Sequence, residues 1–168
     1  MKNVVGNQSF KMQILNLDIS YQKNKLEAMD CLLCMIITGE VNSYKVYEDE
    51  DSIAILDLFP ISPGHVLVMP KKHCRTLVEM EENDAANVFK TVVKIYKALA
   101  NLTPNNDGFN VLQNNGKGAG QEVEHVHFHI IPRFKDDHVR FKFPKYTLLS
   151  AQLKFVQDKL IAVLKNSL

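Results

Sequence analysis

The sequence predicts one α+β domain built on a mostly antiparallel sheet of about five strands, with helices before, between and after the strands. Two patterns and the composition lead to this prediction. Short apolar segments of strand length are separated by turn residues, and one long segment repeats apolar residues at helical spacing. The chain has 168 residues and an apolar content of 46%, which is enough for one hydrophobic core.

The first elements follow a weakly periodic extension over residues 1–28, which we separate from a domain over residues 29–168. Residues 31–38 are almost all apolar and Gly39 follows them, so we expect a short buried helix that ends at this glycine. The segment 43–58 predicts two strands around an acidic turn at 48–51. A third strand is expected over residues 64–70, closed by a proline.

The second half of the domain begins with a long helix. Residues 80–102 carry apolar side chains at helical spacing, and the acidic start of this segment suits the helix dipole. Residues 108–113 and 123–133 predict two further strands, separated by the turn-rich stretch 114–120. Residues 148–164 predict a closing helix, within a C-terminal loop and helix that extends from 135 to 168.

Composition excludes several classes of partner. The formal net charge of +1 gives no global field that would attract nucleic acid or a membrane surface. No apolar run approaches the roughly 18 residues that span a bilayer, and the amino terminus lacks the features of a secretory signal. Three cysteines, an odd number, favour a reducing compartment. We therefore expect a cytoplasmic protein without a membrane partner.

Three of the six histidines, His125, His127 and His129, occupy alternate positions in the stretch GQEVEHVHFHIIPRF, residues 120–134. In a strand they would share one face. Two kinds of chemistry suit such an array: a metal site, because neutral imidazole is a common zinc ligand, and a nucleophilic histidine held in one tautomer by hydrogen bonds. Three buried imidazoles in a purely structural core are costly unless all are satisfied. The triplet alone leaves both chemistries open.

Cys31 and Cys34 form a second pattern of interest. Their C-x-x-C spacing lets one turn of backbone present two thiolates to one metal ion. Two small buried thiols near a helix start, or a redox pair, would give the same spacing.

The segment RFKDDHVRFKFPKY, residues 133–146, interleaves basic and aromatic side chains, as some single-stranded nucleic-acid-binding surfaces do. Asp136 and Asp137 dilute its charge. We interpret the segment as a solvated loop and expect no nucleic-acid partner.

The stretch HVHFHII, residues 125–131, matches the His-φ-His-φ-His-φ-φ signature of the histidine triad (HIT) superfamily, in which φ is an apolar residue. The resemblance continues through residues 30–73 and 108–133, in the family's order, and includes an AGQ sequence before the triad and a distant PGH sequence. It covers about residues 30–134, most of the chain. The domain is therefore identified as a member of this superfamily, with the HIT-like α+β fold.

The resemblance implies an enzyme that attacks the α-phosphate of a nucleotide. His127 would be the nucleophile and form a transient nucleotidyl-imidazole, oriented by the backbone carbonyl of His125. His129 and His65 would bind phosphate oxygens and the leaving group. The chemistry is reasonable, because neutral imidazole is a good nucleophile near neutral pH and, once protonated, a good leaving group.

The resemblance also implies roles in substrate binding. Asp57 would accept hydrogen bonds from the ribose hydroxyls, and Asn114, expected in the strand facing the triad, and Gln121 would reach the phosphates. The base would lie against apolar residues, each of which also suits a plain core, namely Leu32, Leu33, Ile36 and Leu58. Glu122 departs from the family pattern, which has serine or threonine there, and its carboxylate should repel an anionic phosphate.

In the branch of the family that carries the C-x-x-C sequence, the resemblance implies a structural zinc. The ligands would be Cys31, Cys34, His73 and His125, a closed set without an open position, and Cys74 is a competing ligand. No catalytic metal is expected. The expected partners are a purine nucleotide as substrate and a second copy of the chain in a homodimer.

The sequence favours hydrolysis of dinucleoside polyphosphates. The chain has no tryptophan, whereas the phosphoramidase branch of the family bears one at its carboxyl terminus. A purine nucleoside phosphoramidase is the alternative, together with a nucleotide-binding sensor that has little or no catalysis. A metal-binding protein in which the triad itself is the metal site is a third class of function.

Overall fold

The structure is a computed structural model that describes residues 30–141 and 144–166. The chain divides after Asp137 into two compact units. The extension predicted over residues 1–28 lies outside the described residues. Within the described ranges, no helix combines the length and the apolar character that crossing a membrane would require.

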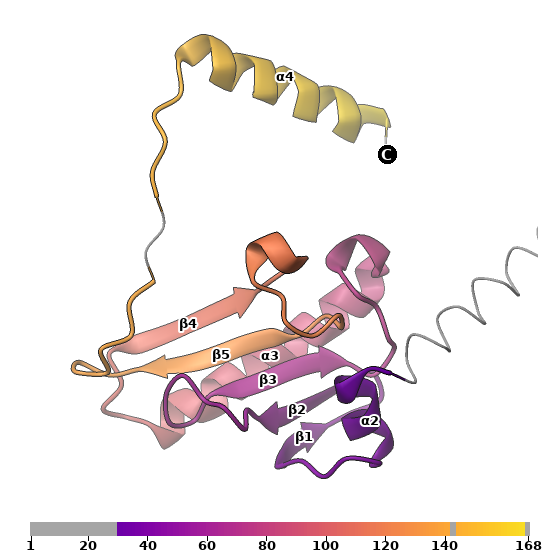
Figure 1. The fold of residues 1–168 in the computed structure, drawn as a ribbon, viewed down its shortest axis with the longest axis vertical. Coiled ribbons are helices and arrows are strands. Elements are labelled where there is room, and N and C mark those ends of the chain that lie inside the picture. Colours follow the sequence, from indigo (N-terminus) through magenta and orange to yellow (C-terminus); the bar gives the residue numbers. More distant parts are fainter. Residues whose placement is uncertain (1–29, 142–143, 167–168) are drawn as a thin grey trace, which may run out of the picture. The chain divides into compact units, whose positions relative to one another are not determined.

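The first unit contains a five-stranded sheet in the order β1-β2-β3-β5-β4 (Figure 1). All four pairs of neighbouring strands are antiparallel, which confirms the predicted fold class. β5 lies between β3 and β4, so the strand that follows the histidine-rich segment is held on both sides. The strands are β1 (Lys45–Glu48), β2 (Ser52–Leu56), β3 (Val66–Pro70), β4 (Gly108–Gln113) and β5 (Phe128–Arg133).

Three α-helices and two short 3₁₀ turns complete the described elements. They are α2 (Leu32–Thr38), η1 (Leu77–Glu79), α3 (Glu82–Leu102), η2 (Lys117–Ala119) and α4 (Ser150–Asn166). α2 ends where the sequence predicts, because Gly39 adopts a left-handed conformation with φ +82° and its N–H bonds the carbonyl of Ile36. The two 3₁₀ turns were not predicted.

The helices of the first unit cover both faces of the sheet. Successive residues of a strand point to opposite faces, and β2 shows this directly. Ala54 belongs to the buried cluster that α3 covers with Val88 and Val92, whereas Ile53 and Ile55 belong to the cluster that α2 covers. In Figure 1, α3 crosses behind the sheet. The side chains at the centre of each cluster, between the sheet and α2 and between the sheet and α3, are fully buried. The close packing on both faces makes the sheet rigid, so it holds the side chains that it bears in fixed positions.

β5 begins at Phe128, later than the predicted strand over residues 123–133. Before it, the N–H of Val126 donates to the carbonyl of Cys74 at 2.8 Å, so the backbone here is bonded to the loop that follows β3. Of the three alternating histidines, only His129 lies in the strand. The prediction that all three lie in one strand is therefore wrong. The N–H of Val126 bonds a loop carbonyl far away in the sequence and not the backbone of a neighbouring strand.

The second unit contains α4, which is close to the helix predicted over residues 148–164. Its apolar side chains are exposed, among them Leu153, Phe155, Val156, Leu160, Ile161, Val163 and Leu164.

Candidate functional site

A cavity of about 490 Å³ opens in the first unit beside the histidines. His65, His127 and His129 line it, and so do Asp57 and Glu122. Its apolar walls include all four residues predicted to hold a base, Leu32, Leu33, Ile36 and Leu58. A cavity with apolar walls and a group of imidazoles suits a ligand that has both a ring system and an anionic group.

His127 is held in one tautomer by the backbone. Its Nδ1 lies 2.5 Å from the carbonyl oxygen of His125, and a carbonyl can only accept a hydrogen bond. The neutral ring therefore has its proton on Nδ1 and its lone pair on Nε2. His127 is 8% exposed and lines the cavity, so this tautomer presents a nucleophilic nitrogen there.

His65 and His129 form a hydrogen-bonded pair, with Nε2 of His65 3.0 Å from Nδ1 of His129. In the tautomer in which Nδ1 of His65 accepts the N–H of Ile61 at 3.2 Å, Nε2 of His65 carries the proton and donates it to Nδ1 of His129. Nε2 of His129 then carries its own proton. Burial, followed by the neighbouring His127, lowers the pKa of His129 to about 4, which keeps it neutral at neutral pH.

Asp57 lies beside this pair. Its Oδ1 accepts a hydrogen bond from the N–H of Phe59 at 2.9 Å, and its Oδ2 is 3.2 Å from Nδ1 of His65. Burial lowers the pKa of His65, and the carboxylate of Asp57 opposes this shift. Asp57 therefore supplies a negative charge that favours a protonated imidazole when an anion enters the cavity.

Gln121 does not line the cavity but stabilises the loop around it. The amide group of this buried side chain donates to the carbonyls of Arg75 at 2.6 Å and Val123 at 3.1 Å, and its oxygen accepts from the N–H of Gly116 at 2.6 Å. These three backbone contacts account for its position. The contact of Gln121 with a phosphate stays a prediction.

Asn114 does line the cavity, although it follows β4 directly and does not lie within the strand. Its Nδ2 donates to the carbonyl of Gly120 at 3.2 Å, which fixes the side chain across the turn. Other lining residues were not singled out from the sequence, because nothing in their local pattern separates them from core or loop. They are Ser43, Ile55, Leu56, Phe59, Ile61, Leu67, Gly120 and Val123.

Next to the cavity, the side chains of Cys31, Cys34, His73 and His125 bring one sulfur or nitrogen atom each within 4.8 Å of the others. Sγ of Cys34 lies 3.2 Å from Nδ1 of His73 and 3.5 Å from Nδ1 of His125, and Sγ of Cys31 lies 3.6 Å from the latter. Tetrahedral zinc, with Zn–S about 2.3 Å and Zn–N about 2.05 Å, separates its sulfur and nitrogen ligands by about 3.6 Å. The four donors therefore match the size of a zinc site.

The protonation state of His125 also suits a metal. Its Nε2 lies 2.9 Å from the carbonyl oxygen of Pro70, so the ring proton is on Nε2 and the lone pair of Nδ1 faces the thiols. Burial lowers the pKa of His125 to about 4, so the ring is neutral at neutral pH, as a metal ligand must be.

The three cysteines are free and buried. Burial, and then the neighbouring Cys31, raises the pKa of Cys34 to about 12, and burial raises the pKa of Cys74 to about 11. A bound cation would lower a thiol pKa again by favouring the thiolate. Cys74 is outside the group of four donors, and its thiol contacts the carbonyl of Lys72.

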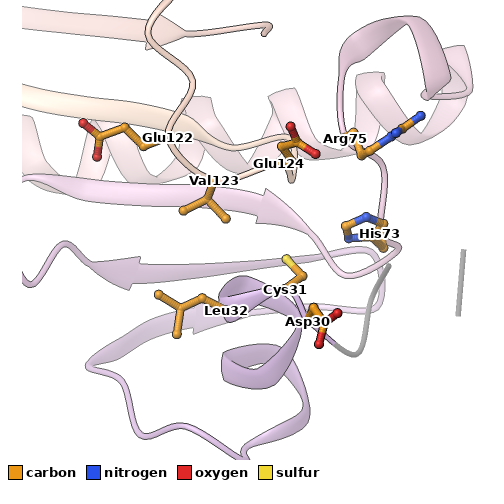
Figure 2. Close-up of a pocket in the computed structure, with 8 residues that line it drawn as sticks. All are labelled: Asp30, Cys31, Leu32, His73, Arg75, Glu122, Val123 and Glu124. Atoms are coloured by element: carbon orange, nitrogen blue, oxygen red, sulfur yellow. The ribbon is translucent and has the colours of Figure 1, made fainter. Parts of the chain in front are cut away.

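A second cavity of about 440 Å³ adjoins the first and shares Leu32, Glu122 and Val123 with it. Figure 2 shows its lining, with the segment that bears Glu122 and Glu124 on one side and the start of α2 on the other. The side chain of Glu122 extends away from the part of the cavity that holds Arg75 (Figure 2). Glu122 therefore stands at the border between the two cavities.

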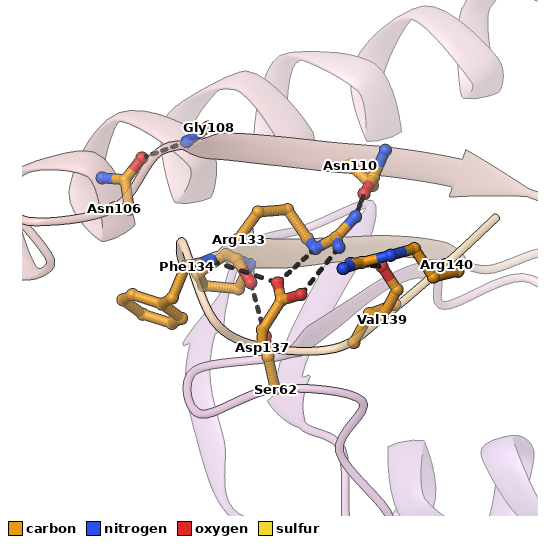
Figure 3. A network of polar contacts seen from close by, with 10 residues as sticks. Ser62, Asn106, Gly108, Asn110, Arg133, Phe134, Asp137, Val139 and Arg140 are labelled. Carbon is orange, nitrogen blue, oxygen red and sulfur yellow. Dashed lines mark hydrogen bonds and ion pairs between the residues drawn. The ribbon is translucent and has the colours of Figure 1, made fainter.

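The basic and aromatic segment after β5 begins with an internal ion pair. The guanidinium of Arg133 donates to both carboxylate oxygens of Asp137, at 2.7 and 2.9 Å, and to Oδ1 of Asn110 at 2.5 Å (Figure 3). These contacts anchor the chain where it leaves the sheet. The described residues 134–141 and 144–149 contain no helix or strand, in agreement with the predicted loop.

Residues 38–136 match the model of the HIT domain family. An uncharacterized HIT-like protein of Methanocaldococcus jannaschii is 48% identical over 67% of this chain and 86% of its own length. An adenosine 5'-monophosphoramidase of Schizosaccharomyces pombe is 36% identical over 82% of this chain and its entire length. A solved zinc-bound histidine triad family protein from Mycobacterium smegmatis is 30% identical, covers 79% of this chain and 99% of its own, and has a TM-score of 0.59.

Proposed function

Because the chain belongs to the HIT domain family, we propose that it hydrolyses nucleotides at the α-phosphate through a nucleotidyl-His127 intermediate. The observation that carries the proposal is the hydrogen bond from Nδ1 of His127 to the carbonyl of His125. This bond leaves the lone pair of Nε2 directed at the cavity, where a phosphate can be attacked.

In the first step, Nε2 of His127 attacks the phosphorus while the bond from phosphorus to the leaving group breaks in line with it. The N–H at Nε2 of His129 donates a hydrogen bond to a phosphate oxygen, and the departing group takes its proton from water. His65 acts behind His129 by fixing its tautomer through their 3.0 Å contact. Asp57 accepts from the ribose hydroxyls, the apolar walls hold the purine, and Asn114 lies within reach of the phosphates.

In the second step, water attacks the phosphorus of the intermediate and the bond to Nε2 breaks. The electron pair of this bond returns to the ring, so His127 leaves as neutral imidazole with its proton still on Nδ1. The products are a nucleoside monophosphate and the protonated leaving group. Burial of His127 limits the access of water to the side of the phosphate opposite the ring, where productive attack occurs.

Two substrate classes share this mechanism. The absence of tryptophan favours dinucleoside polyphosphates. The second candidate is a purine nucleoside phosphoramidate, and two observations support it. A relative that aligns over its whole length is named as an adenosine 5'-monophosphoramidase, and the carboxylate of Glu122 at the border of the cavity disfavours a leaving group with several phosphates. We propose the phosphoramidate as the better substrate.

We further propose that Cys31, Cys34, His73 and His125 hold a structural zinc. Their spacing suits tetrahedral coordination, and the similar zinc-bound protein from Mycobacterium smegmatis supports the choice of metal. A closed set of four ligands supplies a cross-link and no open coordination position. The cross-link would join the start of α2, the loop after β3 and the segment before β5.

A homodimer is the assembly that we propose. Phe89, Val93 and Tyr96 lie at helical spacing on α3 and are 38–51% exposed. Val111, 40% exposed, belongs to β4, which is an edge strand of the sheet. An exposed apolar helix stripe together with an unpaired strand edge is a surface that natural proteins usually cover.

The test compares steady-state hydrolysis of diadenosine tetraphosphate, diadenosine triphosphate and adenosine phosphoramidate by the parent chain. His127→Ala should abolish turnover and retain nucleotide binding, because the lost group makes the bond and does not form the pocket. His138→Asn, which changes an exposed histidine outside the first unit, is the matched control.

Intact-mass spectrometry after rapid acid quenching should detect one nucleotidyl group on the parent chain and none on His127→Ala. Turnover in His127→Ala within tenfold of the parent would refute the role of His127. Nucleotide binding by the parent without turnover or adduct would instead identify a nucleotide sensor.

A further inference from the structure

The leaving group of the proposed reaction must lie on the side of the phosphate opposite His127. Glu122 lines the same cavity as His127 and also lines the second cavity. A leaving group that extends from the first cavity into the second therefore passes Glu122. The second cavity begins at this border and shares Leu32, Glu122 and Val123 with the first (Figure 2).

The charge at this border is negative. Three carboxylates line the second cavity, those of Asp30, Glu122 and Glu124. Of the cavity's two basic side chains, Arg75 is held by the carboxylate of Glu79 at 2.7 Å, and the other, His73, belongs to the metal-binding group. In the described part of the chain, neither Glu122 nor Glu124 forms an ion pair.

We infer that Glu122 is a specificity-determining residue that selects nucleoside phosphoramidates whose leaving amine carries a second, positively charged amino group. The inference rests on the proposed function and narrows its substrate class. A diamine that departs from the phosphate places its distant ammonium group in the second cavity, near Glu122 and Glu124. A polyphosphate leaving group would place several negative charges at the same position and be repelled.

The chemistry balances without a further reactant. Nε2 of His127 forms a bond to phosphorus as the phosphorus–nitrogen bond of the substrate breaks, and the leaving nitrogen takes a proton from a water molecule. The hydroxide formed in this way attacks the phosphorus of the intermediate, which releases the nucleoside monophosphate and neutral His127. The distant ammonium group takes no part in bond making, so its effect is on recognition alone.

Two substrates of equal length isolate that effect. They are the adenosine 5'-phosphoramidates of 1,4-diaminobutane and of n-pentylamine, which differ only in whether the far end is an ammonium or a methyl group. We expect the parent chain to prefer the diamine in kcat/KM by about tenfold, which corresponds to about 1.4 kcal/mol. The preference should fall as salt is raised, because the border is exposed and its charges are screened.

Glu122→Gln should reduce the preference to about threefold or less, and Glu122→Lys should reverse it. Glu82→Gln, which removes an exposed carboxylate from α3, is the control and should leave the ratio unchanged. Equal kcat/KM values for the two substrates in the parent chain, or an unaltered ratio in Glu122→Gln, would overturn the inference.

The two proposals fail in different ways. If neither phosphoramidate is hydrolysed, the proposed phosphoramidate substrate class fails, and calorimetric titration of both compounds then tests the inference by itself. A tenfold tighter Kd for the diamine compound that is lost in Glu122→Gln would support the role of Glu122, and equal Kd values would reject it.

Discussion

Cys34→Ser tests the zinc site most directly, because Cys34 contacts two of the other three donors. Its Sγ lies 3.2 Å from Nδ1 of His73 and 3.5 Å from Nδ1 of His125. The hydroxyl of serine is a poor zinc ligand at neutral pH. Three donors would remain, and the imidazoles of His73 and His125 would lose the atom that both contact. Cys74→Ser is the matched control, since Cys74 is a free, buried cysteine outside the group of four donors.

The expected loss of stability follows from binding linkage. A metal that binds the folded state alone stabilises it by RT ln(1 + [Zn]/Kd), which is about 4 kcal/mol when free zinc is about a thousand times Kd. Structural sites in zinc-finger peptides bind with about 10–16 kcal/mol at neutral pH. We therefore expect Cys34→Ser to lower the free energy of unfolding by at least about 4 kcal/mol. Cys74→Ser should lower it by about 1–2 kcal/mol, the cost of placing a hydroxyl in a buried position.

The assay combines zinc per chain, measured by inductively coupled plasma mass spectrometry, with urea unfolding in the presence and absence of a strong chelator. The parent and Cys74→Ser should each hold one zinc and lose stability on chelation, whereas Cys34→Ser should hold none and be insensitive to the chelator. One zinc per chain in Cys34→Ser would refute the ligand assignment. A parent chain without zinc, and with an unchanged unfolding midpoint after chelation, would refute the zinc site itself.

Four further outcomes are expected. Gly64→Ala should cost about 1–2 kcal/mol and reduce kcat/KM, because Gly64 has φ +85° and a Cβ there would lie 3.3 Å from a side-chain carbon of Pro132. Gly39→Ala, with φ +82° and open space around it, should cost stability alone in the same urea assay. Burial lowers the pKa of His129 from 6.5 to about 4, so its contribution to stability is complete above pH 6.5 and is lost as the pH falls toward 4. His129→Asn should therefore flatten the decline of unfolding free energy between about pH 7 and about pH 5. Val93→Glu should convert a dimer to a monomer in size-exclusion chromatography with light scattering, and a parent chain that is already monomeric would contradict the proposed interface.

Much of the fold was predictable because it depends on local signals. The strand predicted over residues 108–113 matches β4, and the helix expected before Gly39 ends there. Period-2 and period-3.6 apolar patterns and a glycine at a helix end act within a few residues. The start of β5 was predicted wrongly because Val126 bonds the carbonyl of Cys74, a contact between residues far apart in the chain. No local pattern reports such a contact.

For the site, too, local patterns predicted some features, whereas others depend on contacts between residues far apart in the chain. The alternation of histidines indicated chemistry, and the resemblance pointed to residues that the structure places around one cavity, including Asp57, Leu58 and Glu122. The resemblance predicts that Gln121 reaches the phosphates, and the structure adds that its side chain bonds three backbone groups of the loop. Whether a polar side chain serves a ligand or a loop depends on which backbone groups surround it, and only the folded chain determines that.

His125 joins the proposed metal site to the proposed nucleophile. Nδ1 of its ring faces the two thiols, its Nε2 donates to Pro70, and its own carbonyl accepts the proton of His127 at 2.5 Å. A cation bound at Nδ1 would fix the ring, and through it the peptide carbonyl that sets the tautomer of His127. The His-x-His spacing would then serve two purposes, because the first histidine would be a ligand through its side chain and an orienting group through its backbone. Loss of zinc should therefore impair nucleotidyl transfer to His127 even in molecules that remain folded, since the orientation of that carbonyl would no longer be fixed.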